Sequence, residues 1–142
     1  MGFDLEEFTS DPVKELEGVW AYFDVEETQG LLIAEAWNEN FMKAFRKFPR
    51  GFQNRARLGT LDTKTDKRVW HKLLAETILL DWKGISEGGK ALKYDPKLAA
   101  EKMTKYKKFV KFVWDTASEE SLYMKEQAEE DEKNLPPSSG TG

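Results

Sequence analysis

The stretch "ETILLDWKGISEGGKALKYDP", residues Glu76–Pro96, decides the fold that the sequence predicts. Its centre, Ser-Glu-Gly-Gly at 86–89, predicts a tight turn between two short extended segments, because glycine accepts a positive φ at no steric cost. Asp95 is a favoured N-cap residue, and Pro96 is favoured at the first position of a helix. The stretch therefore predicts a short hairpin-like turn between two long helices, with Trp82 buried at the corner between them.

A long helix is expected on each side of this turn. The first begins near Asp62, with Asp62 or Thr63 as its N-cap, and the second follows the Asp-Pro pair and continues to about Lys133, with or without a break near Tyr106. Apolar residues at helical spacing predict the buried faces. They are Val69, Trp70, Leu73, Leu74, Thr77, Ile78, Leu79 and Leu80 in the first helix, and Met103, Tyr106, Phe109, Val110, Val113 and Ala117 in the second.

The residues before this pair of helices predict one smaller β-element. Val19–Val25 is rich in β-forming side chains, Glu26–Gly30 is typical of a turn, and Leu31–Ala34 is typical of a returning strand. Residues 3–17 predict a short acidic helix or an arm, and apolar spacing within residues 41–48 predicts a further short helix. The predicted fold class is mainly α (α+β), a helical domain with a small N-terminal β-hairpin.

Length and composition indicate one globular domain. The chain has 142 residues, of which 39% are hydrophobic and 34% charged. We expect a single helical domain over residues 1–133 and a disordered tail over 134–142, "NLPPSSGTG", which is rich in proline, serine and glycine. There is no cysteine, which fits a reducing cytoplasm, and no secretory signal or membrane-spanning run is recognised.

Charge alternates in blocks along the chain. Residues 1–41 hold eleven acidic residues against Lys14, and residues 42–72 hold ten basic residues against two acidic ones. The next block, up to residue 114, is mildly basic, and the last block is acidic, which gives a net charge of -4. Such blocks either pair with one another within the fold or attract partners.

No catalytic, cofactor-binding or metal-binding residues are predicted. His71 is the single histidine, and a lone histidine on a helix is more typical of the surface or the edge of a core than of a catalyst. Neither a nucleophile elbow, nor a zinc-protease motif, nor a phosphate-binding loop is present. The acid pair Glu119-Glu120 lies on what should be a solvated helix end. We therefore predict a protein that is not an enzyme.

Two basic clusters raise the alternative of nucleic-acid binding. One surrounds Tyr106 and Phe109, and the other surrounds Phe48 and Phe52, so that phosphate contacts and base stacking could combine. Their basic residues are Lys102, Lys105, Lys107, Lys108 and Lys111 in the first cluster, and Arg46, Lys47, Arg50, Arg55 and Arg57 in the second. The predicted burial of Tyr106 and Phe109 and the acidic chain argue against this interpretation, so we expect no nucleic-acid partner.

Two aromatic residues lie away from the predicted buried stripe of the last helix. Phe112 and Trp114 could form an exposed protein-binding patch, with Lys111, Asp115 and Glu119 as its polar rim. The alternative is that both rings pack against the N-terminal hairpin. If they do, a partner surface is expected elsewhere, for example on the hairpin around Trp20 and Phe23.

Several segments together resemble the tail assembly chaperones of long-tailed phages and prophages. They are "AETILLDWKGI" (75–85), "LKYDPKLAAEKM" (92–103) and "FVKFVWDTASEESLY" (109–123), preceded by "EGVWAYFD" (17–24) and "LLIAEAWNENFMKAF" (31–45). The positions that carry the resemblance are helix caps and aromatic residues. They are Asp81, Trp82, Gly84, Tyr94, Asp95, Pro96, Phe109, Phe112, Val113, Ala117 and Tyr123.

The resemblance implies a function without chemistry. Members of that family bind the tape measure protein before the tail tube forms, keep this client soluble, and are absent from the finished particle. A longer, frameshifted form recruits tail tube subunits in many of them. We therefore expect a chaperone in the host cytoplasm that acts in several copies, binds no membrane and uses Phe112 and Trp114 as contact residues. The alternative function is a structural virion protein, such as a minor tail or head–tail connector component.

Overall fold

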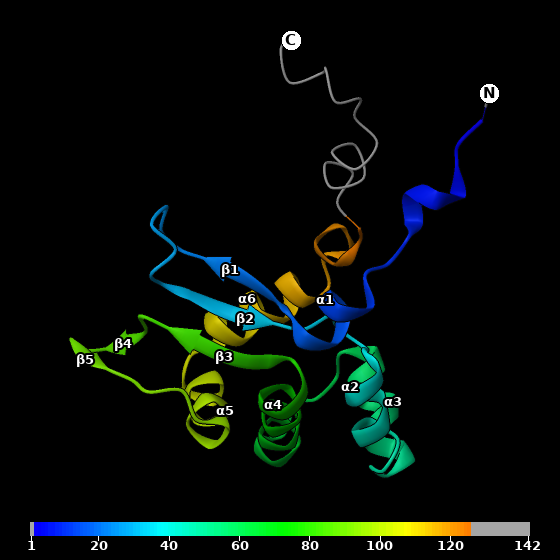
Figure 1. Cartoon of the computed structure of the whole chain (residues 1–142). Helices are drawn as coiled ribbons and strands as arrows, with labels where there is room; N and C mark the ends of the chain where they lie inside the picture. Colours follow the sequence, from blue (N-terminus) through cyan, green and yellow to red (C-terminus); the bar gives the residue numbers. More distant parts are fainter. Residues whose placement is uncertain (1, 126–142) are drawn as a thin grey trace.

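The chain forms an α+β domain in which helices pack against a three-stranded antiparallel sheet (Figure 1). The computed structural model describes residues 2–125. Its elements are η1 (Leu5–Phe8), α1 (Pro12–Glu17), β1 (Val19–Tyr22), β2 (Gly30–Ile33), α2 (Glu39–Phe45), α3 (Arg50–Leu58), α4 (Lys64–Thr77), β3 (Leu79–Lys83), β4 (Ser86–Glu87), β5 (Lys90–Ala91), α5 (Pro96–Lys105), α6 (Lys107–Ala117) and η2 (Glu120–Tyr123).

The sheet has the strand order β1-β2-β3, and both pairings are antiparallel. Strands β1 and β2 form the predicted N-terminal hairpin, in which Val19 lies opposite Ile33. Strand β2 is central, and Leu31 and Ile33 are fully buried where the sheet meets the helices. Helices α4 and α5 contact β3, and α6 contacts β2, so the buried side of the sheet carries the core.

Strand β3 shows that the predicted fold class was wrong. The prediction confined β-structure to the N-terminal hairpin and the short turn, and it placed Leu79 and Leu80 on the buried face of a helix. The helix α4 ends at Thr77 instead, and Leu79–Lys83 is a strand paired with β2. A short apolar run fits a buried strand as well as a helix end, and an isolated hairpin is marginal in water. Pairing with β3 satisfies the second edge of β2, and this favours the strand.

The predicted helix starts are confirmed by their caps. The Thr63 hydroxyl accepts a hydrogen bond from the Asp66 amide at 3.1 Å, and the Asp95 carboxylate accepts one from the Leu98 amide at 3.1 Å, with Pro96 in the first turn. These bonds satisfy amide groups that the first turn of a helix leaves free.

The second predicted helix divides at Tyr106 into α5 and α6. Tyr106 has φ −115° and ψ 95°, which are not helical angles, and its side chain is 43% exposed, so it does not belong to the buried stripe. Helix α6 ends at Ala117, and only the short turn η2 follows within the described residues. The predicted boundary at residue 133 and the predicted disordered tail 134–142 lie outside the described residues.

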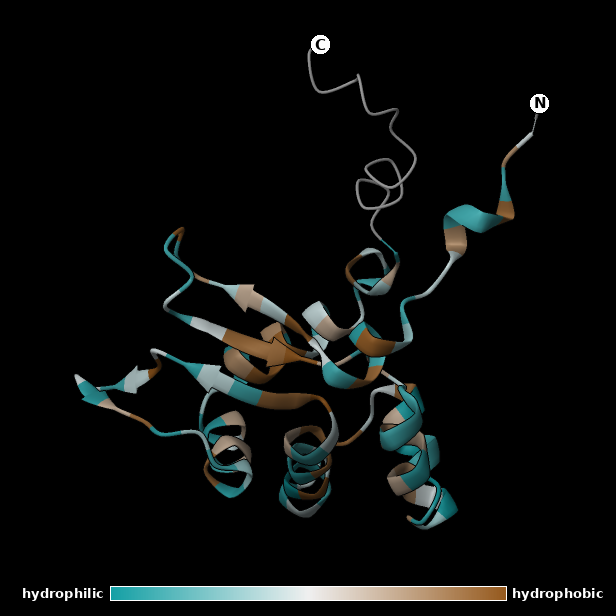
Figure 2. Cartoon of the chain, viewed as in Figure 1, coloured by the Kyte–Doolittle hydropathy of each residue, from teal (hydrophilic) through white to brown (hydrophobic). Residues whose placement is uncertain are grey.

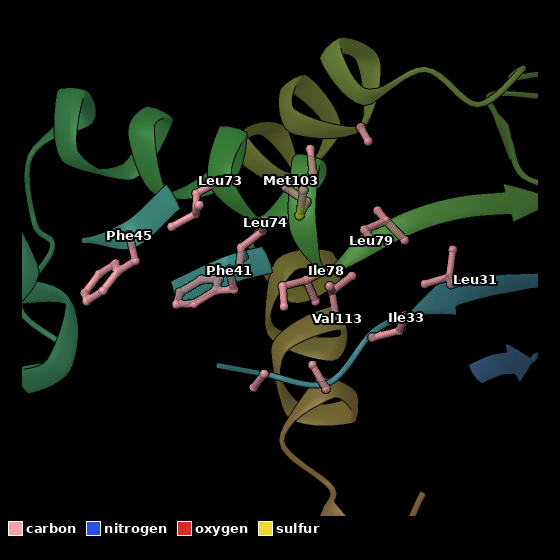
Figure 3. Packing of buried hydrophobic residues seen from close by; sticks show 14 of the residues in the cluster. Leu31, Ile33, Phe41, Phe45, Leu73, Leu74, Ile78, Leu79, Met103 and Val113 are labelled. Atoms are coloured by element: carbon pink, nitrogen blue, oxygen red, sulfur yellow. The ribbon is translucent and has the colours of Figure 1, made fainter. Parts of the chain in front are cut away.

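One apolar core joins the sheet to the helices (Figure 3). Phe41 and Phe45 come from α2, Leu74 from α4, Met103 from α5 and Val113 from α6, and all five side chains are fully buried. Burial of each such side chain stabilises the fold by about 1.5–3 kcal/mol before entropy is counted. In Figure 2 the most hydrophobic stretches of the sheet are β2 and the first part of β3, while the helices carry both hydrophobic and hydrophilic residues.

Candidate protein-binding surface

Helix α6 carries both residues that the sequence singled out as contact residues. Its inner face places Val113 and Ala117 in the core, with Phe109 and Val110 half-buried beside them. Phe112 and Trp114 lie on opposite sides of this buried line, because successive residues of a helix are rotated by about 100°. The two aromatic residues therefore meet different parts of the molecule.

Phe112 contributes to an exposed aromatic patch where the hairpin meets α6. Its side chain is 39% exposed, and its ring centroid lies 5.4 Å from that of Phe23, which is 53% exposed. Exposed apolar residues that lie next to each other are candidates for contact with a partner, unlike apolar residues scattered singly over a surface. We call this pair of residues, Phe23 and Phe112, the hairpin–α6 patch.

The polar rim predicted for this patch is partly in place. Lys111 and Asp115 form an ion pair one turn apart on α6, with both side chains largely exposed. Glu119 is exposed in the turn that follows α6. Exposed ion pairs of this kind contribute little to stability, so the rim can serve orientation and solubility instead.

Trp114 belongs to a packed aromatic cluster instead of the hairpin–α6 patch. Its ring centroid lies 5.0 Å from Trp70, 5.6 Å from Trp37 and 6.0 Å from Phe41. Edge-to-face aromatic contacts of this kind add about 0.5–1.5 kcal/mol each beyond the burial of area. The structure thus places Phe112 against Phe23 of the N-terminal hairpin and Trp114 among Trp37, Phe41 and Trp70.

Trp37 is held against this cluster by the chain that enters α2. It has a positive φ of 62° and remains 39% exposed, and its ring makes edge contacts to Phe41 and Phe45 at 4.9 and 5.4 Å. The next residue, Asn38, caps α2 by accepting a hydrogen bond from the Phe41 amide at 2.9 Å, and its amide group donates to the Thr77 carbonyl at 3.1 Å. The cluster is therefore anchored from three elements, α2, α4 and α6.

A groove of about 490 Å³ runs beside the cluster, between the end of α3, α4, the α5–α6 junction and α6. Its lining is apolar apart from Thr104, His71 and the three side chains of Lys67, Lys107 and Lys111. The His71 imidazole is buried, with Nδ1 2.7 Å from the Thr104 hydroxyl oxygen, and burial lowers its pKa, so it is neutral near pH 7. We call this feature the lysine-rimmed groove. Its lining residues are Ala56, Gly59, Leu61, Lys67, Trp70, His71, Met103, Thr104, Lys107, Val110, Lys111 and Trp114.

The predicted corner motif is structural, and its centre is the indole of Trp82. Trp82 is 5% exposed, and its Nε1 donates a hydrogen bond to the Leu92 carbonyl at 2.8 Å. The Tyr94 ring meets the indole edge-on at 5.2 Å, and its hydroxyl donates to the Leu79 carbonyl at 2.6 Å. Burial raises the pKa of Tyr94 to about 12, so this hydroxyl stays protonated and able to donate.

Two further motif residues hold the corner backbone. Asp81 accepts a hydrogen bond from the Trp82 amide at 2.8 Å. Gly84 has a φ of 65°, and a Cβ at this position would lie 2.4 Å from the Thr28 carbonyl oxygen in the hairpin loop. Gly84 is therefore required both for its backbone conformation and for the close approach of β3 to the hairpin.

The turn after the corner is tied to α5 by a charged cluster. Strands β4 and β5 are joined by Gly88 and Gly89, which both have positive φ, as the sequence predicted for a tight turn. The Glu87 carboxylate accepts hydrogen bonds from Lys102 at 2.6 Å, from the Tyr106 hydroxyl and from Lys105 at 3.0 Å. Together these donors, with Lys102 first, lower the pKa of Glu87 to about 2. These basic residues of α5 are thus engaged within the protein.

The sequence offered the N-terminal hairpin as a packing partner for both aromatic residues; Phe112 contacts Phe23 of that hairpin, whereas the rings around Trp114 were not predicted. Phe23 was named only as a fallback on the hairpin, and Trp37 was not named at all. Phe23 lies within the predicted strand Val19–Val25, and its amide donates to the Gln29 carbonyl at 2.8 Å, so no local signal marked its ring as the one that meets Phe112. No local signal reveals the contact of Trp37 with Trp114, because the two residues are far apart in the sequence.

The described residues offer no arrangement for metal chemistry or membrane insertion. Within residues 2–125, no three histidine, cysteine, aspartate or glutamate side chains are grouped so that they could hold a metal ion. In the same part of the chain, no helix is long and apolar enough to cross a bilayer.

Comparison with known families identifies the origin of the chain. A family model described as "YdaY prophage protein" matches residues 36–134, which is more than half of the chain. The match includes α2 to η2 with the corner, the aromatic cluster and the lysine-rimmed groove, whereas the N-terminal arm and β1 precede it. No curated protein and no solved structure shows significant similarity to the chain. The chain belongs to the YdaY prophage protein family and is thus a protein of prophage origin.

Proposed function

We propose that this prophage protein is a non-catalytic tail assembly chaperone that binds the tape measure protein during tail morphogenesis. The observation that carries the proposal is the hairpin–α6 patch, where Phe23 and Phe112 present two accessible rings side by side. The resemblance of residues 17–123 to tail assembly chaperones and the prophage family support the same context. The client would be a long helical protein with apolar faces that must be covered before assembly.

The patch has the composition that such a client requires. Amphipathic helices are recognised by apolar anchors at a few positions, and the interface energy concentrates in these anchors. Phe23 and Phe112 would be the anchors, and the Lys111–Asp115 pair would border them. Removal of an anchor of this kind typically weakens binding by about 2 kcal/mol or more. Several copies bound along one client would add avidity to modest individual contacts.

Co-expression with the tape measure protein of the same prophage tests this function. We expect the client to be soluble and to co-purify with the wild-type protein, and to lose both properties with the Phe23→Ala/Phe112→Ala variant. The matched control is Leu58→Ala, which removes an apolar side chain that is 76% exposed on α3. The proposal fails if the client is equally soluble without the protein, or if the patch variant rescues it as well as the control does.

A structural virion protein is the second function that an observation favours. The chain carries an acidic block, residues 1–41, and a basic block, residues 42–72, and opposite charges of this kind suit repeated contacts between subunits. Mass spectrometry of purified particles separates the two functions. The chaperone should be absent from the particle and present in the host cytoplasm, with tail tube subunits as further partners, whereas a stoichiometric amount in the particle would identify a minor tail or connector component.

A further inference from the structure

The N-terminal arm, residues 2–8, is an acidic segment with an uncovered apolar surface. Phe3, Leu5 and Phe8 are 69%, 78% and 64% exposed, although they are the only large apolar side chains of the segment. The rings of Phe3 and Phe8 contact each other at 5.2 Å, so these side chains already gather before any partner is present. All charged side chains of the arm are acidic, namely Asp4, Glu6 and Glu7.

The body of the protein holds the chain only from Thr9 onward. The Lys125 amide donates to the Thr9 carbonyl at 2.9 Å, Ser10 forms a β-bridge with Met124, and the Asp11 amide donates to the Tyr123 carbonyl at 2.9 Å. Before this anchor, η1 is a single turn capped by Asp4, and it projects from the body (Figure 1). Its apolar side chains therefore remain largely exposed in a single copy, although Phe8 also borders a cavity with Trp37 and Met124.

The lysine-rimmed groove has the complementary properties. Its floor is apolar and includes Trp70, Val110 and Trp114, and its charged lining residues are all lysines. Lys67 and Lys107 are exposed at its edge, and the buried His71 is neutral and adds no charge. A segment that fills this groove favourably must therefore carry apolar side chains together with acidic ones.

We propose that the protein associates with a second copy of itself by placing its N-terminal arm in the lysine-rimmed groove of that copy. Phe3, Leu5 and Phe8 would cover the apolar floor, and the three acidic residues would meet the lysines. Burial of these apolar side chains would favour association, against the loss of freedom that association costs. The inference does not depend on the proposed function, because it uses neither Phe23 nor Phe112.

The position of the two features favours contact between copies. In Figure 1 the arm leaves the molecule at the upper right, whereas α3, α4 and α5, which border the groove, lie at the bottom. An arm of seven residues reaches at most about 25 Å when fully extended. Exchange of arms can close a two-fold dimer if it is reciprocal, and it produces rings or open chains if it is not.

A nucleic acid is a poorer occupant of the same groove. Single strands require aromatic faces on which bases can stack. Here the rings of Trp70 and Trp114 pack against each other at 5.0 Å, and both also contact Phe41. The tryptophans are thus engaged within the protein, which leaves an apolar floor suited to side chains.

Cysteine cross-linking tests the contact directly, because the chain contains no cysteine. A Leu5→Cys copy is mixed with a Lys67→Cys copy that carries a different tag, under mild oxidation. We expect a disulfide-linked pair of the two copies. In the matched control, Val25→Cys, at a residue that is 95% exposed on the hairpin, replaces Leu5→Cys and should link far less. Equal linking by both pairs would overturn the proposal.

Sedimentation measurements with exposed-residue variants provide the second test. Leu5→Asp in the arm, or Lys67→Glu with Lys107→Glu in the groove, should shift the wild-type assembly toward monomer without changing the thermal melt. Combining the groove variant with Asp4→Lys and Glu7→Lys should restore association. Two outcomes would overturn the proposal: a monomeric wild type, or groove variants that associate as strongly as the wild type does. Leu5→Asp should still keep the client soluble, because the proposed chaperone surface consists of Phe23 and Phe112. This measurement therefore separates the association of copies from the chaperone function.

Discussion

The corner around Trp82 and the hairpin–α6 patch are both built from aromatic side chains. Only at the corner do these side chains find packing and hydrogen-bond partners within one copy of the protein. Trp82 is almost fully buried, its indole N–H has an acceptor, and the Tyr94 ring contacts it edge-on. Phe23 and Phe112 share one ring contact and remain exposed. The difference shows that aromatic content alone does not indicate function. What matters is whether the fold supplies partners for each ring.

The largest expected effect is at the corner. Trp82→Ala should lower the free energy of unfolding by about 3–5 kcal/mol, because it removes a large core side chain and leaves a cavity. Urea unfolding measures the change. Trp82→Phe is the matched control, since it keeps an aromatic ring but loses the hydrogen bond to Leu92, and it should cost less. An unchanged urea midpoint for Trp82→Ala would mean that the Trp82 ring is exposed. The corner and the hairpin–α6 patch would then not differ in the burial of their rings.

The second prediction compares Phe112 and Trp114, the two aromatic residues of α6 that lie on opposite sides of its buried line. Trp114→Ala should destabilise the protein by about 2–3 kcal/mol, because the ring is half-buried and contacts three other aromatic rings. Phe112→Ala should change stability by less than about 1 kcal/mol, as expected for a substitution at an exposed site. Thermal unfolding of the two variants side by side gives the comparison. Equal destabilisation would mean that Phe112 also belongs to the core.

These residues also show what could be predicted from the sequence. Helix caps depend on residues three positions apart, so Asp95 and Pro96 could be assigned and the first cap narrowed to Asp62 or Thr63, of which Thr63 is the cap. The glycine turn and the N-terminal hairpin are equally local, and the burial of Trp82 follows from its place between two apolar segments.

The incorrect and missing predictions depend on contacts between distant parts of the chain. Leu79 and Leu80 form a strand because β2, far earlier in the sequence, offers an unpaired edge. Trp114 is packed because Trp37 and Trp70 come to it from other elements. For the candidate site, the off-stripe position of Phe112 could be read from helical spacing, but its partner Phe23 and the lysine-rimmed groove require the tertiary structure.

The third prediction tests how the corner is attached to the hairpin. Gly84→Ala places a Cβ against the Thr28 carbonyl oxygen at a positive φ, so it combines backbone strain of about 1–2 kcal/mol with a steric conflict. Gly59→Ala is the matched control, because Gly59 also has a positive φ, 71°, but faces open space. We expect Gly84→Ala to be about 1 kcal/mol more destabilising than the control in urea unfolding. Equal effects would show that only the backbone angle matters at residue 84.

The smallest effect is expected from the charged cluster that ties the corner turn to α5. The pKa of Glu87 is about 2 in the folded protein, against 4.5 as its ordinary value, because Lys102, Tyr106 and Lys105 donate to its carboxylate. A lowered folded pKa means that the cluster stabilises the protein fully above about pH 4.5, and that this contribution is lost as the pH falls toward about 2.

Glu87→Gln should therefore reduce the steepness with which stability falls between about pH 4.5 and about pH 2, while its effect at pH 7 stays modest because the ion pairs are partly exposed. Unfolding free energies measured across this range, with Asp115→Gln as a control for an exposed pair on α6, give the comparison. The same slope in wild type and Glu87→Gln would mean that the Glu87 carboxylate is solvated, and that the turn is held by Trp82 and the Leu92–Ile85 backbone hydrogen bond alone. In that case the corner would resemble the hairpin–α6 patch more closely than its burial indicates.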